Sequence, residues 1–165
     1  MTTGTVRLLD IEDWSLYRSL RLAALADAPA AFGSTLSRER AFTKQTWQER
    51  LAARNTFIAE VDDRACGLVA VVTTGLDAAE LVGMWVSPGA RGRGVSDLLV
   101  LAVLAWANER DLPEVRLWVA EGNHHAERLY ARHGFQRTGA VQPVRVGEER
   151  QEFAMARTAP SRAIP

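Results

Sequence analysis

The sequence predicts a single α/β domain built on a mixed, twisted sheet of six to seven strands flanked by about four helices. The chain has 165 residues, which is the size of one domain and is enough to bury a core without disulfides or metals. Segments with strand-like and helix-like patterns alternate along it. Near the middle, a strand, a long helix and another strand follow each other, and such a crossover unit places the two strands parallel in one sheet.

The first half of the chain is expected to form a strand, two helices and a hairpin. Asp13 is a suitable cap for the first helix, whose apolar residues recur at helical spacing until Pro29 ends it. Asp62-Asp63-Arg64 separates two apolar segments and indicates a tight antiparallel turn. The expected elements span residues 6–9, 14–28, 44–54, 55–61 and 65–74.

The second half is expected to add strands and two further helices, after a loop over residues 75–79. The helix that begins at Val95 has apolar residues on more than one side, so we expect it to be buried on more than one face. Asn123 caps a shorter helix, and Gly134 supplies the turn that ends it. The expected elements span residues 80–86, 95–106, 115–120, 124–133, 135–141 and 149–156.

Composition and charge exclude several classes of protein. Twenty Lys and Arg balance twenty Asp and Glu, so no global charge attracts nucleic acid or an anionic membrane. The single Cys66 excludes an internal disulfide and an all-cysteine metal site, and no apolar segment is long enough to span a membrane. We therefore expect a cytoplasmic protein without nucleic-acid or membrane partners, with a domain over residues 1–158 and a flexible tail over residues 159–165.

Glycine and arginine are concentrated between a predicted strand and the long helix. In this glycine turn, residues 89–94, Gly92 and Gly94 let a ligand approach the backbone, while Arg91 and Arg93 supply positive charge. A turn at a helix N-terminus exposes backbone N–H groups, and the helix dipole favours negative charge there. The segment predicts a pyrophosphate site, and an ordinary tight turn with solvated arginines is the alternative.

Two motifs together resemble those of a known family. Arg91-Gly92-Arg93-Gly94-Val95-Ser96 is similar to the Arg/Gln-x-x-Gly-x-Gly/Ala signature of the GNAT family of N-acetyltransferases, with Ser96 where Gly or Ala is usual. The segment from Asn123 to Phe135 matches every fixed position of the family's Asn-x-x-Ala-x-x-Leu-Tyr-x-x-x-Gly-Phe pattern. The motifs stand in the family's order, and the resemblance extends over nearly all of residues 5–157.

The resemblance implies that acetyl-CoA is the co-substrate and that its pyrophosphate binds the glycine turn. It also implies that Tyr130 is the acid that protonates the leaving thiolate, the alternative being a buried ring whose hydroxyl bonds the backbone. In the family, the strand before the turn parts from its parallel neighbour and holds pantetheine with free backbone groups. The residues expected to bind acetyl-CoA are Met84, Trp85, Val86, Arg91, Gly92, Arg93, Gly94, Val95, Ser96, Asn123 and Tyr130.

Glu80 is the candidate general base. It lies eleven positions before Arg91, the offset at which the histone-acetylating branch of the family carries its catalytic glutamate. Strand alternation places its side chain on the same face as Val82, Met84 and Val86. A solvated carboxylate, with the proton leaving through a water chain, is the alternative.

The expected reaction is direct transfer of acetyl from acetyl-CoA to a primary amine of a small molecule. Cys66 precedes Gly67 in an apolar strand and is expected to be a buried hydrophobe rather than a nucleophile. Trp118 lies five residues before Asn123, where the branch acting on protein N-termini often has glutamate, which weakens that role. Acetylation of a protein N-terminus or lysine, and a non-catalytic CoA-binding sensor module, are the alternatives.

The resemblance implies that the acceptor binds at the first two helices and their connection. An aromatic wall or an acidic group that attracts a cation would suit this role, although core packing or a solvated surface explains each residue equally well. The candidates are Phe32, Trp47, Trp85, Glu39, Glu49 and Asp77. His124 and His125 are adjacent and diverge on a helix, so no metal site is expected. Apolar surface on the long helix and the last strands is compatible with a homodimer.

Overall fold

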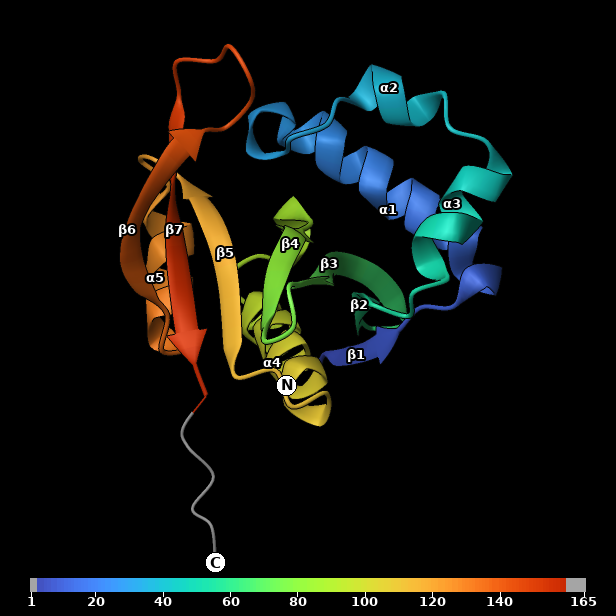
Figure 1. Ribbon diagram of the computed structural model, residues 1–165. Coiled ribbons are helices and arrows are strands. Elements are labelled where there is room, and N and C mark those ends of the chain that lie inside the picture. Colours follow the sequence, from blue (N-terminus) through green and yellow to red (C-terminus); the bar gives the residue numbers. More distant parts are fainter. Residues whose placement is uncertain (1–2, 160–165) are drawn as a thin grey trace, which may run out of the picture.

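The computed structural model describes residues 3–159 and shows one seven-stranded sheet with helices on both faces (Figure 1). The strand order is β1-β2-β3-β4-β5-β7-β6, and among these pairs β4 and β5 alone run parallel. The strands are β1 Thr5–Leu8, β2 Thr56–Val61, β3 Arg64–Thr74, β4 Ala78–Val86, β5 Glu114–Ala120, β6 Gln136–Pro143 and β7 Gln151–Thr158. The helices are α1 Trp14–Asp27, α2 Leu36–Arg40, α3 Lys44–Leu51, α4 Val95–Glu109 and α5 His124–Arg132. The predicted fold class is confirmed.

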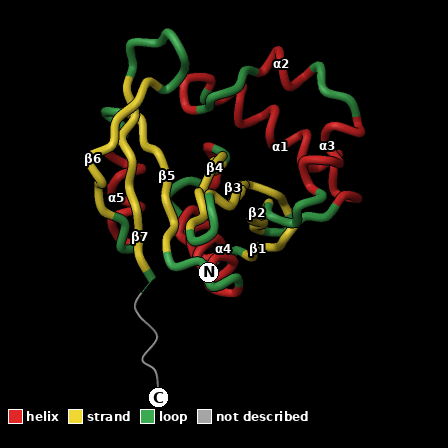
Figure 2. Tube along the Cα trace, viewed as in Figure 1, coloured by secondary structure: helices red, strands yellow, loops and turns green. Residues whose placement is uncertain are grey.

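The core consists of two hydrophobic clusters, one on each face of the sheet. Successive strand residues alternate between them, so that Ile58 packs with α1 and α3 while Ala59 packs with α4. Figure 2 shows α1, α2 and α3 gathered on one side of the strands. Trp47 is buried in that cluster, and Leu99 and Leu129 hold α4 and α5 in the other.

Helix α4 buries one broad face rather than its whole circumference. Val95, Leu99 and Val103 are buried against the sheet, whereas Leu101 is 52% exposed. The expectation of burial on more than one face was therefore wrong for the side that carries Leu101, because the sheet covers only one side of the helix.

The structure differs from the sequence expectation in the start of one strand, in an additional helix and in a helix cap. β4 begins at Ala78, inside the loop expected over residues 75–79. The five-residue α2 was not predicted. Asp13 does not cap α1; with Asp10 it forms a capping box around the short 3-10 turn Ile11–Asp13.

β4 parts from β5 after a short parallel ladder. The ladder joins Ala78–Glu80 to Glu114–Arg116 and extends no further. On the other side of β4, the register with β3 shifts, and Gly83, with φ of +65°, lies at this bulge. Beyond the bulge the inner edges of β4 and β5 diverge, as the ribbon shows (Figure 1). The expected parting of the two strands is therefore observed.

The bulge breaks the alternation expected for β4. One extra residue reverses the faces that the following side chains occupy. Leu81 and Val86 both belong to the α4 cluster, whereas Trp85 belongs to the cluster under α1 and α3. Glu80 therefore shares its face with Trp85, and the prediction that it shares a face with Met84 and Val86 was wrong.

Two further expectations were that no segment spans a membrane and that residues 159–165 form a tail. Within residues 3–159, no helix is long and apolar enough to cross a bilayer. At the start of the expected tail, the Ala159 N–H donates to the Pro113 carbonyl at 2.7 Å. Residues 160–165 of that tail lie outside the described residues.

Candidate active site

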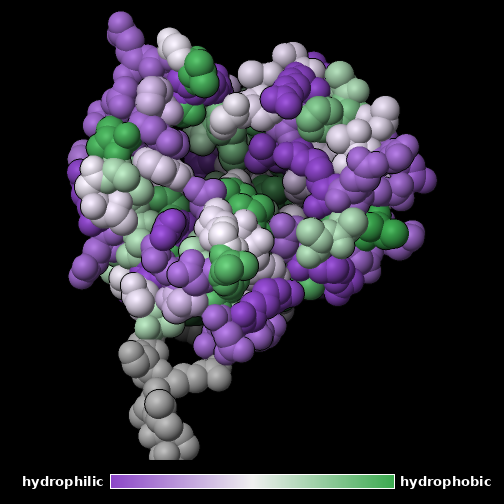
Figure 3. Space-filling model, viewed as in Figure 1, coloured by the Kyte–Doolittle hydropathy of each residue, from purple (hydrophilic) through white to green (hydrophobic). Residues whose placement is uncertain are grey.

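A cavity of about 710 Å³ opens where β4 and β5 part. Its walls come mainly from α1 and the loop after it, from β4 and β5, from the start of α4 and from α5, and residues of α3, β2, β3, β6 and β7 complete the lining. In Figure 3 the surface is hollowed between the side of α1 and α2 and the side of β6 and β7. The predicted site residues that line it are Glu80, Met84, Trp85, Val86, Arg91, Ser96, Asn123 and Tyr130. The other predicted residues, Gly92, Arg93, Gly94 and Val95, lie in the adjoining turn and first helical position.

The glycine turn presents a row of unbonded backbone N–H groups at the start of α4. From Gly92 to Asp97, none of these groups donates to another residue within 3–159. Gly92 and Gly94 have φ of +75° and +79°, which glycine adopts without strain. Nothing lies within 4 Å of where a side chain would begin at either glycine. Open space, free donors and the dipole of a fifteen-residue helix together fit a diphosphate.

Arg91 points back into the protein rather than out of the turn. Its Nε donates to the Val86 carbonyl at 3.0 Å, and its Nη2 donates to Oδ2 of Asp27 at 2.5 Å. The indole Nε1 of Trp85 donates to the same oxygen at 3.0 Å. These hydrogen bonds from Trp85 and Arg91 lower the pKa of the Asp27 carboxyl. Arg91 therefore ties the last residue of α1 to β4, while Arg93 is exposed and forms no ion pair with a described residue.

Tyr130 lines the cavity from a buried ring. Tyr130 is 5% exposed, and its ring packs edge-on against Phe135, with the centroids 5.8 Å apart. Its hydroxyl has no hydrogen-bond partner among residues 3–159 and is not sealed from solvent. Burial raises the pKa of Tyr130, so the phenol remains protonated at neutral pH and above.

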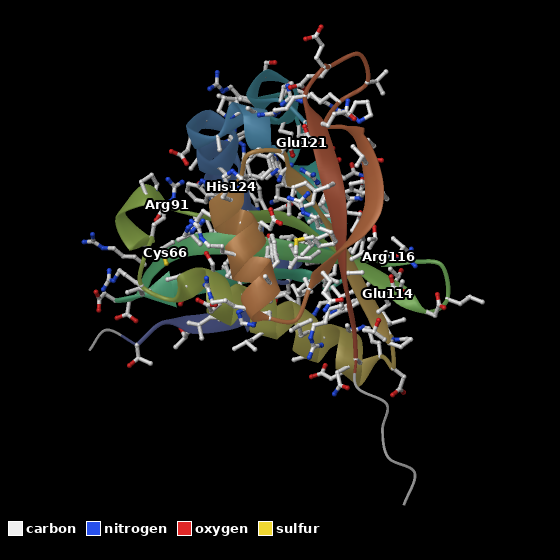
Figure 4. All side chains as sticks on the ribbon, turned by 90° about the vertical axis from the view of Figure 1, so that its left-hand side faces the viewer. Cys66, Arg91, Glu114, Arg116, Glu121 and His124 are labelled. Atoms are coloured by element: carbon white, nitrogen blue, oxygen red, sulfur yellow. The ribbon has the colours of Figure 1, made fainter. Side chains whose placement is uncertain are left out.

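Asn123 borders the cavity at the start of α5. Its Oδ1 accepts the Ala126 N–H at 3.1 Å, which caps the helix and leaves the side-chain amide hydrogens without a partner in the described part of the chain. Figure 4 labels His124, the next residue, and Arg91 on the glycine turn, and these two labels mark the elements that flank the opening.

Several candidates lie in the core or on the open surface instead. Trp47 is completely buried, and Glu49 and Asp77 are exposed outside the cavity lining. Cys66 is buried with Sγ 3.6 Å from the Ala59 carbonyl, and burial raises the pKa of its thiol. Across the described residues, no cluster of three His, Cys, Asp or Glu side chains could hold a metal ion.

Sequence reasoning missed four charged residues at or beside the cavity. Arg21, Arg50 and Glu152 line it, and Asp27 holds Arg91 and Trp85 as described above. Glu152 comes from β7 and accepts a hydrogen bond from Gln142 at 2.8 Å. The i, i+4 spacing of Tyr17 and Arg21 on α1 is the one sequence signal that could have paired these two lining residues.

Comparison with known proteins decides the family. A sequence model of the acetyltransferase (GNAT) family matches residues 18–135. This chain belongs to that family. A relative, mycothiol acetyltransferase of Thermomonospora curvata, is 34% identical to this GNAT chain over 114 residues, which are 69% of this chain and 37% of that protein.

Solved structures show the GNAT fold over almost the whole chain. The structure of yncA from Salmonella typhimurium with its cofactor acetyl-CoA has a TM-score of 0.77 at 19% identity, covering 99% of this chain and 98% of that one. The ribosomal-protein-S18-alanine N-acetyltransferase from Escherichia coli has a TM-score of 0.71 at 16% identity, covering 98% and 97%. Matches to three curated relatives span 37%, 58% and 40% of those proteins' own lengths.

Proposed function

We propose that this GNAT chain transfers acetyl from acetyl-CoA to a primary amine of a small molecule, by direct attack of the amine on the thioester. Three features that meet at one cavity support this function. They are the unpaired inner edge of β4, the row of free N–H groups at the start of α4, and the unbonded hydroxyl of Tyr130.

The backbone would do most of the binding. Acetyl-CoA supplies the acetyl group as a reactive thioester. The N–H groups from Gly92 to Asp97 would bind its diphosphate, with Arg93 adding charge. The edge of β4 at Met84–Val86 has no partner in β5, so it would hold the pantetheine arm and give a hydrogen bond to the thioester carbonyl. A fixed backbone donor is well suited to stabilise the negative charge that develops on this oxygen.

The transfer itself needs one acid and one base. The amine nitrogen bonds to the carbonyl carbon as the carbon–sulfur bond breaks. Tyr130 would give its proton to the departing sulfur, and the nitrogen would lose a proton to Glu80, directly or through water. Both side chains line the cavity, and neither side chain has a hydrogen-bond partner within residues 3–159.

Direct attack is favoured over an acyl-enzyme intermediate because the thiol of the cysteine lies outside the cavity. Cys66, the single cysteine, is 7% exposed and outside the cavity lining. Its raised pKa further disfavours the thiolate, which is the nucleophilic form.

A small acceptor is favoured because two loops meet at the cavity. Arg145, between β6 and β7, donates to the carbonyls of Phe32 and Pro29 at 3.1 and 2.5 Å, and Arg150 donates to the Ala30 carbonyl. These hydrogen bonds hold the loop after α1 against the loop after β6. The joined loops leave less room at the cavity for an acceptor group that is attached to a folded protein.

A thioester-consumption screen across small amines, N-terminal peptides and lysine peptides tests the proposal. Turnover of small amines is expected, and turnover of peptides alone would contradict the small-molecule assignment. Calorimetry with CoA separates the remaining outcomes. Binding without turnover of any amine would indicate a CoA-binding module, and the absence of both heat and thermal protection would remove the co-substrate.

A further inference from the structure

The cavity contains two arginines that the proposed reaction does not use. Arg21 on α1 and Arg50 on α3 both line it, and both contact the same buried carboxylate, Glu39 on α2. We propose that this arginine pair, Arg21 and Arg50, binds a carboxylate of the acceptor. The acceptor would then be an amino acid or a similarly small amino carboxylate, an inference that rests on the proposed transferase function.

The charges of the three residues do not balance. Glu39 is fully buried, and its two oxygens accept from Nε of Arg21 at 3.0 and 3.2 Å, while one of them also accepts from Nη1 of Arg50. One carboxylate neutralises one guanidinium, so one positive charge is left over. The arginine pair shares this charge; the side chain of Arg21 is 11% exposed and that of Arg50 is 34% exposed. A charge with limited access to water favours a second anion beside it.

The unused donors of Arg21 lie where an acceptor would react. Within residues 3–159, its two Nη atoms donate to nothing, and Nη1 lies 3.3 Å from where a side chain would begin at Gly83. Gly83 is at the β4 bulge, next to Met84, whose strand edge would hold the thioester carbonyl. A carboxylate bound there lies close to the attacking amine, so the two groups are separated by a few bonds, as in an amino acid.

Aromatic rings hold both guanidinium groups in place. The Arg21 guanidinium lies over Phe32 at 4.8 Å from the ring centre. Arg50 lies over Tyr17, Phe42 and Trp47 at 5.9, 5.5 and 5.6 Å. Planar donors fixed before binding match a carboxylate with little loss of side-chain freedom.

The same cavity also contains negative charge for the ammonium form of the acceptor. Glu80 and Glu152 line it from β4 and β7. The lining therefore offers cations and anions together, which suits a zwitterion better than a simple amine or a blocked peptide. If the three residues served only to join α1, α2 and α3, changing Arg21 would affect every acceptor equally, and this difference makes the two roles separable.

The experiment compares kcat/KM for free amino acids with kcat/KM for the corresponding amino-acid amides, which keep the amine and lack the carboxylate. We expect the best amino acid to exceed its amide at least about tenfold, equivalent to ~1.4 kcal/mol, mainly through KM. Arg21→Gln should bring this ratio close to one while KM for acetyl-CoA is unchanged. Arg40→Gln is the matched control, because Arg40 is exposed beside Glu39 and outside the cavity lining.

A second variant covers the case in which Arg21→Gln fails to fold. Glu39→Gln removes the competing charge and keeps an acceptor oxygen, so the ratio should rise above that of the wild type. An unchanged ratio in either folded variant would overturn the proposal, as would a wild-type ratio near one or a preference for amides or peptides. If no amine at all is acetylated, the proposed function fails as well, which distinguishes the two.

Discussion

Replacing Tyr130 by phenylalanine removes a hydroxyl from the cavity wall and leaves the ring in place. The hydroxyl has no hydrogen-bond partner within residues 3–159, and the ring packs against Phe135 at 5.8 Å. The substitution therefore breaks no internal hydrogen bond and opens no core cavity. The free energy of unfolding should change by less than about 0.5 kcal/mol, so that any loss of activity reports chemistry rather than folding.

The expected loss of activity follows from the role of an acid. A positioned proton donor contributes about 10²–10⁴ to the rate, equivalent to ~2.7–5.4 kcal/mol of the activation barrier. Because the proposed pyrophosphate and pantetheine contacts are made by backbone groups of the glycine turn and of β4, kcat should fall by about this factor while acetyl-CoA affinity is retained. In the wild type, ionisation of Tyr130 should not lower kcat below pH 10, because burial raises its pKa above the ordinary value of 10.0.

The assay measures kcat at saturating amine, acetyl-CoA affinity by calorimetry, and unfolding by urea for the same preparations. Tyr17→Phe is the matched variant, because Tyr17 also lines the cavity but lies on α1, away from the glycine turn. It should reduce kcat far less than Tyr130→Phe. Equal kcat in wild type and Tyr130→Phe would refute the assignment of the acid, and a large fall in stability would refute the reasoning from the unbonded hydroxyl.

Three further predictions follow from packing and backbone geometry. Gly94→Val should weaken CoA binding at least tenfold and reduce the free energy of unfolding by about 1–3 kcal/mol, because φ at Gly94 is +79°. Gly75→Val is the control, because Gly75 has φ of +69° in the β3–β4 turn. It should show a similar loss of stability in urea, whereas calorimetry should show unchanged CoA affinity. Trp47→Ala should reduce the free energy of unfolding by about 3–5 kcal/mol in urea, since the ring is fully buried, and a loss below ~1 kcal/mol would contradict its core role. Burial raises the pKa of Tyr17 and of Tyr130 above 10.0. The contribution of the two protonated phenols to stability is therefore complete below pH 10 and is lost as the pH rises beyond it. Between pH 8 and 11, the free energy of unfolding in urea should fall less for the variant with both tyrosines replaced by phenylalanine than for the wild type.

Local signals explain what the sequence could predict. The glycine turn, the Asn123 cap and the strand–helix–strand crossover each depend on residues close together in the chain. That the glycine turn and Tyr130 serve one site was implied by the family resemblance that two motifs carry, and both border one cavity. The parting of β4 from β5 was implied by the family resemblance and is present.

Contacts between distant segments explain what was missed. Glu39 is buried because Arg21 and Arg50 reach it from two other helices, and no local pattern marks a glutamate for such pairing. Asp27 similarly gains its role from Trp85 and Arg91, which lie 58 and 64 residues further along the chain. Helix α2 has only five residues, which are too few to show a periodic pattern of apolar side chains.

The bulge in β4 is an intermediate case. Gly83 stands inside an apolar strand, and an isolated glycine in such a place often marks a bulge. Strict alternation ignores this, which is why Glu80 was grouped with Met84 and Val86 rather than with Trp85.

The separation of β4 from β5 also bears on how this domain can be engineered. Unpaired strand edges often pair with strands of other molecules and so promote aggregation. Here the unpaired edges of β4 and β5 face each other within one domain, so neither edge is open to another molecule. Additional hydrogen bonds between β4 and β5 beyond Glu80 and Arg116 would stabilise the domain, but they would also close the gap between the two strands where the cavity opens. Selection for heat resistance alone is therefore expected to enrich inactive chains, a conflict between robustness and activity that is built into the sheet.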